Sequence, residues 1–152
     1  MKLAGKSILL IDDAYNANPA SMAAALDLAA QLTPAPGGRR IAVLADLLEL
    51  GANAPRYHAD LAEPIVKAGI DKVYVAGQLM INLWAALLKR LRAKKVDSVK
   101  ALLPILQDEI CDGDIVLFKC SHETKLFSVV SALRKLDEVR IPPTIVHAES
   151  WH

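Results

Sequence analysis

The sequence predicts an α/β fold in which a mainly parallel, doubly wound sheet lies between two layers of helices. Two observations predict it. Short segments rich in branched apolar residues alternate with longer segments of helical spacing, which is the pattern of repeated strand–helix units. The short segments also carry apolar side chains on both faces, as strands do when helices cover both sides of a parallel sheet.

Four segments are expected to form the strands of this sheet. They are Ser7–Asp12, Arg40–Ala45, Lys72–Ala76 and Asp114–Lys119. A fifth, weaker strand is expected near Lys95–Asp97. Together with the helices between them, these strands predict a three-layer, Rossmann-like fold.

Five helices are expected in the intervals. They are Pro19–Leu32, Pro55–Ala68, Gln78–Lys94, Ser98–Ile110 and Ser121–Leu136. Asn18 is a good N-cap ahead of Pro19 at the first helical position. Ser98 and Ser121 stand where a capping serine is favoured. Pro64 lies inside the second helix and predicts a kink or a break there.

The composition is that of one folded domain. A chain of 152 residues is comfortable for one domain and short for two. Hydrophobic residues make up 53% and the net charge is +1, which argues against a nucleic-acid-binding protein and against a disordered chain. We expect the domain to span residues 1–138. Residues 139–152, which include Pro142-Pro143 and show no periodicity, are expected to be a loosely attached tail.

Cysteine and histidine usage favours a reduced protein without a metal centre. Cys111 and Cys120 form no CxxC pair, so a cytosolic protein is the simple interpretation. None of the four histidines has metal-ligand spacing with a cysteine or another histidine. Neither a signal peptide nor an apolar stretch of membrane-spanning length is evident.

Charged residues follow the predicted strands at their carboxyl ends. Asp12-Asp13 end the first strand, Asp46 follows the second and Lys119 ends the last. Ligands of open α/β sheets bind outside the carboxyl ends of the strands, so these groups are candidates for one site. The alternative is that acids and lysines merely prefer strand termini and helix caps, and for any single residue the two interpretations are about equally weighted.

These motifs also resemble those of two other protein classes. Gly5-Lys6-Ser7 resembles the end of a P-loop, but no strand precedes it and no helix follows it. The acidic pair, Asp46 and Lys119 also match the acids and lysine of response-regulator receiver domains. That alternative requires an aspartate after the third strand, whereas Asp46 follows the second. A free-standing binding or scaffold domain also remains open.

Three sequence blocks resemble the Mur ligase family. Asp12–Met22 reads DDAYNANPASM, which is similar to the opening of that family's C-terminal domain. Ile41–Gly51 reads IAVLADLLELG and resembles the family's strand followed by its Gly-Asp-Met-x-Glu-Leu-Gly turn. Gly113–Ser121 resembles its last strand, which ends in Lys-Gly-Ser. Asparagine at position 16, where sister ligases tend to have histidine, favours the branch that adds D-alanyl-D-alanine.

The chain departs from the family pattern at three places. Ala45 and Cys120 replace glycines, and His122-Glu123 replaces the usual residues after the serine. These changes leave a Mur ligase of another amino-acid specificity as an alternative.

The resemblance implies the C-terminal domain of an ATP-dependent, amide-bond-forming ligase of peptidoglycan synthesis. Such enzymes activate the carboxylate of a UDP-N-acetylmuramoyl-tripeptide with ATP, and the amine of D-alanyl-D-alanine then attacks. The P-loop and the Mg²⁺ ligands lie in a central domain, so this domain alone is expected to be inactive and to hold no catalytic residue. The expected setting is a monomeric protein of the bacterial cytoplasm whose partners are these substrates and the ligase's N-terminal and central domains.

The resemblance also implies which residues bind ligands. Asp13, Tyr15, Asn16 and Asn18 are expected on the nucleotide side, where a carboxylate can accept from two ribose hydroxyls. For Asn18 a helix-capping role is favoured about two to one. The expected substrate-binding residues are Asp46, Glu49, His58, Lys119, Ser121 and His122. A lysine and a serine at a helix N-terminus suit an anion such as the substrate's carboxylate, whereas Glu49 is equally well a solvated turn residue.

Overall fold

The computed structural model describes residues 2–3, 6–13, 19–48, 50–121, 124–135 and 145–147. A six-stranded sheet of order β6-β5-β4-β7-β3-β8 forms its centre, and every pairing in it is parallel. The strands are β3 (Leu9–Asp13), β4 (Arg40–Ala45), β5 (Lys72–Ala76), β6 (Arg92–Val96), β7 (Ile115–Lys119) and β8 (Ile145–His147). A separate antiparallel pair joins β1 (Lys2–Leu3) to β2 (Lys6–Ser7).

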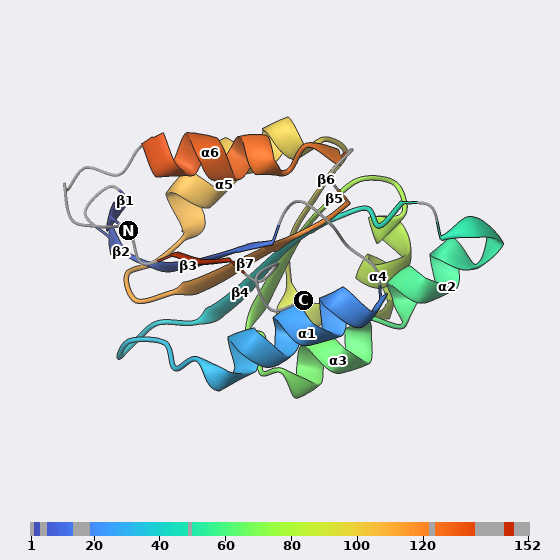
Figure 1. Cartoon of the computed structure of the whole chain (residues 1–152), viewed down its shortest axis with the longest axis horizontal. Coiled ribbons are helices and arrows are strands. Elements are labelled where there is room, and N and C mark those ends of the chain that lie inside the picture. The colour runs from blue at the N-terminus through green and yellow to red at the C-terminus, as the bar shows by residue number, and fades with distance from the viewer. Residues whose placement is uncertain are drawn as a thin grey trace.

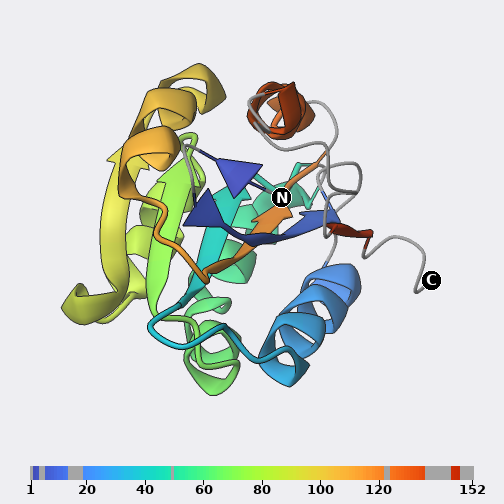
Figure 2. The ribbon, with the colours of Figure 1, turned by 90° about the vertical axis from the view of Figure 1, so that its left-hand side faces the viewer.

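Helices cover both faces of the sheet (Figure 1). One face carries α1 (Pro19–Gln31), α3 (Ala62–Lys67) and α4 (Met80–Ala86), while α2 (Ala54–Ala59) extends beyond the sheet beside α4. The other face carries α5 (Leu102–Glu109) and α6 (Phe127–Lys135). Short 3₁₀ helices are η1 (Gly51–Asn53), η2 (Lys89–Leu91) and η3 (Val99–Ala101). Figure 2 shows the same layers from the side.

Each layer of helices encloses its own apolar core. Ile11, Leu44 and Leu117 point from the sheet toward the layer formed by α1, α3 and α4. Leu10 and Phe118, one position away along the same strands, point toward α5 and α6. The alternation explains why these strands carry apolar side chains on both faces, as the sequence predicts. The predicted three-layer, doubly wound α/β fold is confirmed.

The strand order excludes the receiver alternative. Counted along the chain, β3 to β7 lie in the order 4-3-2-5-1. Receiver domains have the order 2-1-3-4-5. Asp46 follows the second of these strands, as expected, so it does not occupy the place of a receiver's phosphorylated aspartate.

The predicted helix Gln78–Lys94 is wrong in its second half. The helix ends at Ala86, Leu87 and Leu88 are extended, and the chain enters η2 and then β6. Leu83, Leu87 and Leu91 have helical spacing and all are buried in one core. They reach it from three different local conformations, which a periodicity argument cannot distinguish. The fifth strand therefore begins at Arg92, not at Lys95.

The predicted second helix is broken, but not at its proline. The chain forms α2 and α3, with Asp60 and Leu61 between them. Pro64 lies in the first turn of α3, where the missing N–H removes no helical hydrogen bond. Two serine caps predicted from the sequence are also wrong. The Ser98 side chain makes no capping hydrogen bond, and α6 begins at Phe127 instead of next to Ser121.

Part of the predicted tail is paired to the sheet. Ile145–His147 forms β8, which runs parallel to Leu10–Asp12 of β3. The rest of residues 139–152 lies outside the described chain, so the domain boundary at residue 138 stays a prediction. No helix of the described residues is long and apolar enough to cross a bilayer.

A buried acid holds the chain together at the amino ends of the strands. Asp114, with no exposed surface, forms an ion pair with Arg39 whose Nη2–Oδ2 distance is 3.0 Å. The same carboxylate accepts from the backbone N–H groups of Arg39 and Cys111, each at 2.8 Å. Hydrogen bonding to Asp114 raises the pKa of the Arg39 guanidinium. Asp114 therefore joins the loop before β4 to the turn between α5 and β7.

Tyr74 provides a pH-dependent part of the stability. Burial, and then its hydrogen bond to Glu109 Oε1 at 2.9 Å, raise the pKa of the phenol above its ordinary value of 10.0. The folded state therefore keeps a proton that the unfolded state loses as the pH rises through 10. This contribution is complete below pH 10 and is lost as the pH rises toward the folded-state value.

Tyr74→Phe is expected to flatten the alkaline loss of stability. The slope of unfolding free energy against pH should differ between the two proteins by up to about 1.4 kcal/mol per pH unit above pH 10. Urea unfolding between pH 9 and 11.5 measures this difference, and the Tyr74→Phe chain supplies the contribution of every other titrating group. Parallel curves for the two proteins would show that Tyr74 ionises equally in both states.

Candidate functional site

The sheet changes winding direction at β7. The chain leaves β3 and β4 toward the face covered by α1 and α3, whereas it leaves β7 toward α6 on the other face. β7 lies between β3 and β4. At its carboxyl end the chain turns to one face of the sheet, whereas at the ends of both neighbouring strands it turns to the other face. Open α/β sheets bind ligands at such a point. The carboxyl ends of β3, β7 and β4 are therefore the candidate site.

Two acids end β3, and the first of them is held by a helix. Asp12 is buried and forms an ion pair with Arg134 of α6, with an Oδ2–Nη2 distance of 2.8 Å. Asp13, the next residue, occupies the register position beside Lys119. Asp12 thus ties α6 to the sheet, and the predicted contact of Asp13 with a ligand stays a prediction.

Lys119 lies at the centre of this strand end. In register it is beside Asp13 of β3 and Leu44 of β4, and its side chain has no exposed surface. A buried charge interacts more strongly with other charges than a solvated one does. The position suits a cation that acts on an anionic group at the strand ends, while the predicted contact with a substrate carboxylate stays a prediction.

The loop that follows β4 contains Asp46, whose carboxylate is anchored on the next strand connection. Asp46 Oδ1 accepts from the backbone N–H of Met80, at the first residue of α4, at 3.1 Å. The position of the Asp46 carboxylate requires glycine at position 77, because a Cβ on that residue would lie 2.5 Å from Asp46 Oδ1. Gly77 also has a φ of +110°, a backbone conformation that residues with side chains disfavour. Asp46 therefore joins the ends of β4 and β5.

His58 contacts the loop after β4 from inside the protein. It has no exposed surface, and its Nε2 accepts from the backbone N–H of Leu47 at 2.9 Å. The ring is thus the tautomer protonated on Nδ1, which donates to the carbonyl of Ala54 at 2.7 Å. Both ring nitrogens are used by the backbone. The geometry supports a role in holding the loop, and the predicted contact of His58 with substrate stays a prediction.

Ser121 holds the adjacent residue of that loop. Its Oγ accepts from the backbone N–H of Leu48 at 2.8 Å, and its own N–H donates to the carbonyl of Asp46 at 3.3 Å. The hydroxyl predicted to cap a helix instead joins the end of β7 to the end of β4. Asp46, His58 and Ser121, distant in sequence, therefore meet on one loop.

Several predicted site residues lie outside the described residues. They are Tyr15, Asn16, Asn18, Glu49 and His122. Of Asp13 only the backbone is described. The nucleotide-side expectations and the capping role of Asn18 therefore stay predictions.

Sequence reasoning missed three contributors to the site. Gly77 and the backbone N–H of Met80 set the position of the Asp46 carboxylate. Arg134 forms an ion pair with Asp12. Of these three, only Gly77 has a signal in the sequence, because it is a glycine directly after a buried strand. An arginine 122 residues away in sequence has no local signature.

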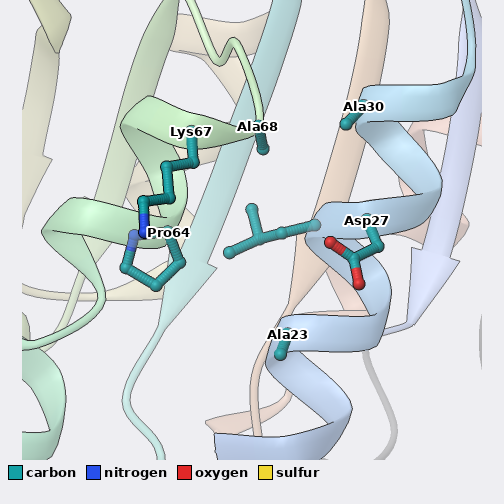
Figure 3. Close-up of a pocket in the computed structure, with 7 residues that line it drawn as sticks. Ala23, Asp27, Ala30, Pro64, Lys67 and Ala68 are labelled. Atoms are coloured by element: carbon teal, nitrogen blue, oxygen red, sulfur yellow. The ribbon is translucent and has the colours of Figure 1, made fainter.

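The described residues contain no metal cluster, and the pocket described below lies away from the strand ends. No group of three or more His, Cys, Asp or Glu side chains there is placed to hold a metal ion. A small open pocket of about 170 Å³ lies between α1 and α3 (Figure 3). It is lined by Ala23, Leu26, Asp27, Ala30, Pro64, Lys67 and Ala68. The lining is made by this helical layer rather than by strand ends, and the pocket is smaller than the usual 300–1,000 Å³ of small-molecule sites.

Comparisons with known proteins place the chain in one family. The model of the family described as Mur ligase, glutamate ligase domain, matches residues 1–122. The UDP-N-acetylmuramoyl-tripeptide–D-alanyl-D-alanine ligase of Bacillus subtilis is 35% identical over 127 residues, which cover 82% of this chain and 27% of that protein. The enzyme of the same name from Rickettsia prowazekii is 32% identical over 121 residues, covering 80% and 26%. The chain thus spans about a quarter of the length of these curated relatives.

A solved structure shows the same fold. The MurF ligase from Thermotoga maritima in complex with ADP superposes with a TM-score of 0.71 at 26% identity, over 90% of this chain and 30% of that one.

Proposed function

Because the chain belongs to the Mur ligase family and spans its glutamate ligase domain, we propose that it is the C-terminal domain of an ATP-dependent peptidoglycan ligase. The proposed reaction joins D-alanyl-D-alanine to UDP-N-acetylmuramoyl-tripeptide, as the names of the curated relatives state for those proteins. The observation that carries the proposal is that Asp13, Lys119 and the loop after β4 lie at the carboxyl ends of three neighbouring strands. The proposed setting is the bacterial cytoplasm, with the enzyme acting as a monomer.

The strand ends divide the proposed site into two sides. Asp13, at the end of β3, lies on the nucleotide side, where its carboxylate accepts from ribose hydroxyls of ATP together with Tyr15, Asn16 and Asn18. Lys119 and the loop after β4 lie on the side of the incoming amine, where Lys119 attracts the carboxylate of the dipeptide and Ser121 holds the loop. ATP supplies the phosphoryl group that activates the tripeptide carboxylate, and the parent's other domains supply the P-loop and the Mg²⁺ ligands.

The proposal explains why an acid at the end of β3 lies in register with a buried lysine at the end of β7. Domain closure over the nucleotide expels water, which protects an activated carboxylate from hydrolysis. It also brings the amine to that carboxylate in a defined orientation. The isolated chain supplies only part of the residues that contact each substrate, and it is therefore expected to be inactive.

Phosphate release by the parent ligase tests the proposal. With ATP and UDP-N-acetylmuramoyl-tripeptide, release is expected to require D-alanyl-D-alanine. Asp13→Asn should raise the KM for ATP, and Lys119→Met should reduce kcat/KM for the dipeptide by about 100-fold, as expected when a buried charge-assisted contact worth about 3 kcal/mol is lost. The exposed Asp27→Asn and Lys67→Met provide matched charge controls on the same domain.

Two outcomes contradict the proposal at different levels. If a single amino acid, and not the dipeptide, supports release, the family assignment stands and the specificity is that of a sister ligase. The buried Cys120 and the sequence His122-Glu123 would then be the first positions to exchange. If no amine supports release, the proposed reaction is wrong.

A further inference from the structure

The loop after β4 is fixed by acceptors from two separate elements. His58 of α2 accepts from the N–H of Leu47, and Ser121 after β7 accepts from the N–H of Leu48. Two consecutive amides are thereby directed into the protein by side chains 63 positions apart in the sequence (121 minus 58). Asp46, immediately before them, is held by Met80. We refer to Asp46–Leu48 as the clamped loop.

The two acceptors are buried, and His58 has no ring nitrogen left for a second partner. His58 is fully buried with both nitrogens engaged. Ser121 is 6% exposed, and its Oγ accepts from the N–H of Leu48. A buried amide that loses its acceptor costs about 1–3 kcal/mol, so the loop has a strong reason to keep this one conformation. The geometry favours holding the loop over touching a ligand.

We propose that His58 and Ser121 are positioning residues that set the affinity for the incoming amine by fixing the clamped loop. This inference rests on the proposed ligase function. The clamped loop follows β4, beside Lys119 on β7, whereas the nucleotide side lies at β3. β3 and β4 are separated by one strand, and thus by about 10 Å. A change in the loop therefore acts on the amine and leaves the nucleotide unaffected.

The first part of the test measures the clamp in this chain without substrates. Amide hydrogen exchange at Leu47 and Leu48 is expected to quicken at least tenfold in His58→Ala and in Ser121→Ala. His58→Gln should restore slow exchange, because its side-chain oxygen can accept from Leu47. Ser121→Ala removes one oxygen and leaves no large cavity, so this variant remains informative if His58→Ala fails to fold.

The second part measures kinetics in the parent ligase. His58→Ala and Ser121→Ala should raise the KM for D-alanyl-D-alanine at least tenfold while the KM for ATP changes less than twofold. His58→Gln should return the dipeptide KM to within threefold of wild type. Tyr74→Phe is the matched control, because it removes one buried hydrogen bond on the opposite face and should leave both KM values unchanged.

Each other result overturns the inference. A raised dipeptide KM with unchanged amide exchange would mean that Ser121 or His58 contacts the substrate directly. Faster exchange with an unchanged dipeptide KM, or an equal rise in both KM values, would mean that the clamp serves stability alone. These failures are separate from that of the proposed function, because wild-type phosphate release that ignores every amine would reject the ligase reaction itself and, with it, the amine-positioning role.

Discussion

Asp114→Ala is expected to destabilise the domain by about 3–5 kcal/mol, because two backbone N–H groups, each costing about 1–3 kcal/mol when left unpaired, lose their acceptor together. The carboxylate has no exposed surface and accepts from the Arg39 guanidinium and from two backbone N–H groups. Alanine would leave these donors without their acceptor at the amino edge of the sheet. Since whole domains are stable by about 5–15 kcal/mol, the variant should be close to unfolded at 37 °C.

Urea unfolding of this chain at neutral pH measures the effect. Asp114→Asn keeps the shape and one oxygen, so it should lose less stability than Asp114→Ala. The exposed Asp108→Ala controls for removal of a carboxylate from the surface and should change stability by less than about 0.5 kcal/mol. A loss of under about 1 kcal/mol in Asp114→Ala would show that water replaces the missing acceptor.

Gly77→Ala is the second substitution with a large expected effect. The backbone φ of +110° is strained for alanine by about 1–3 kcal/mol. The new Cβ would also lie 2.5 Å from Asp46 Oδ1. The carboxylate must therefore move away and lose its hydrogen bond to Met80, which adds about 1 kcal/mol. The total loss of stability should be about 2–4 kcal/mol.

A double-mutant cycle separates the two parts of the Gly77 effect. In an Asp46→Ala background the collision is absent, so Gly77→Ala should cost measurably less than it does in the wild type. Gly37→Ala is a matched control, because Gly37 also has a positive φ, of +82°, but an added Cβ there meets nothing within 4 Å. Strict additivity of Gly77→Ala and Asp46→Ala would mean that the two residues do not constrain each other.

The parts of the fold that the sequence predicts are those governed by local pattern. β4 and β5 have the predicted bounds, because buried parallel strands are continuous apolar segments between polar residues. The pattern fails at Leu87–Leu91, where helical spacing continues through a helix end, an extended pair and a 3₁₀ turn. β8 pairs only three residues with β3, and so short a strand leaves little periodicity to detect.

The sequence predicts which residues of the candidate site follow the strands. Asp46, Lys119 and Ser121 were identified from their place after strands, and the fold brings them to neighbouring strands. The orientation of each side chain was not predictable. Asp12 and Asp13 are adjacent acids, yet the pleat turns Asp12 to Arg134 on α6. Ser121 in turn uses its hydroxyl on Leu48, a partner 73 residues away in sequence.

The pairing of β8 with β3 has a consequence for self-association. An open strand edge offers unpaired N–H and C=O groups to other chains, and proteins protect such edges by covering or charging them. Here the edge strand β6 carries the exposed Lys94 and Lys95, whereas β3 is covered by Ile145–His147. A chain shortened before Ile145 would expose the apolar strand Leu9–Asp13 at its edge, and intermolecular strand addition, leading to aggregation, would be the hazard of that truncation.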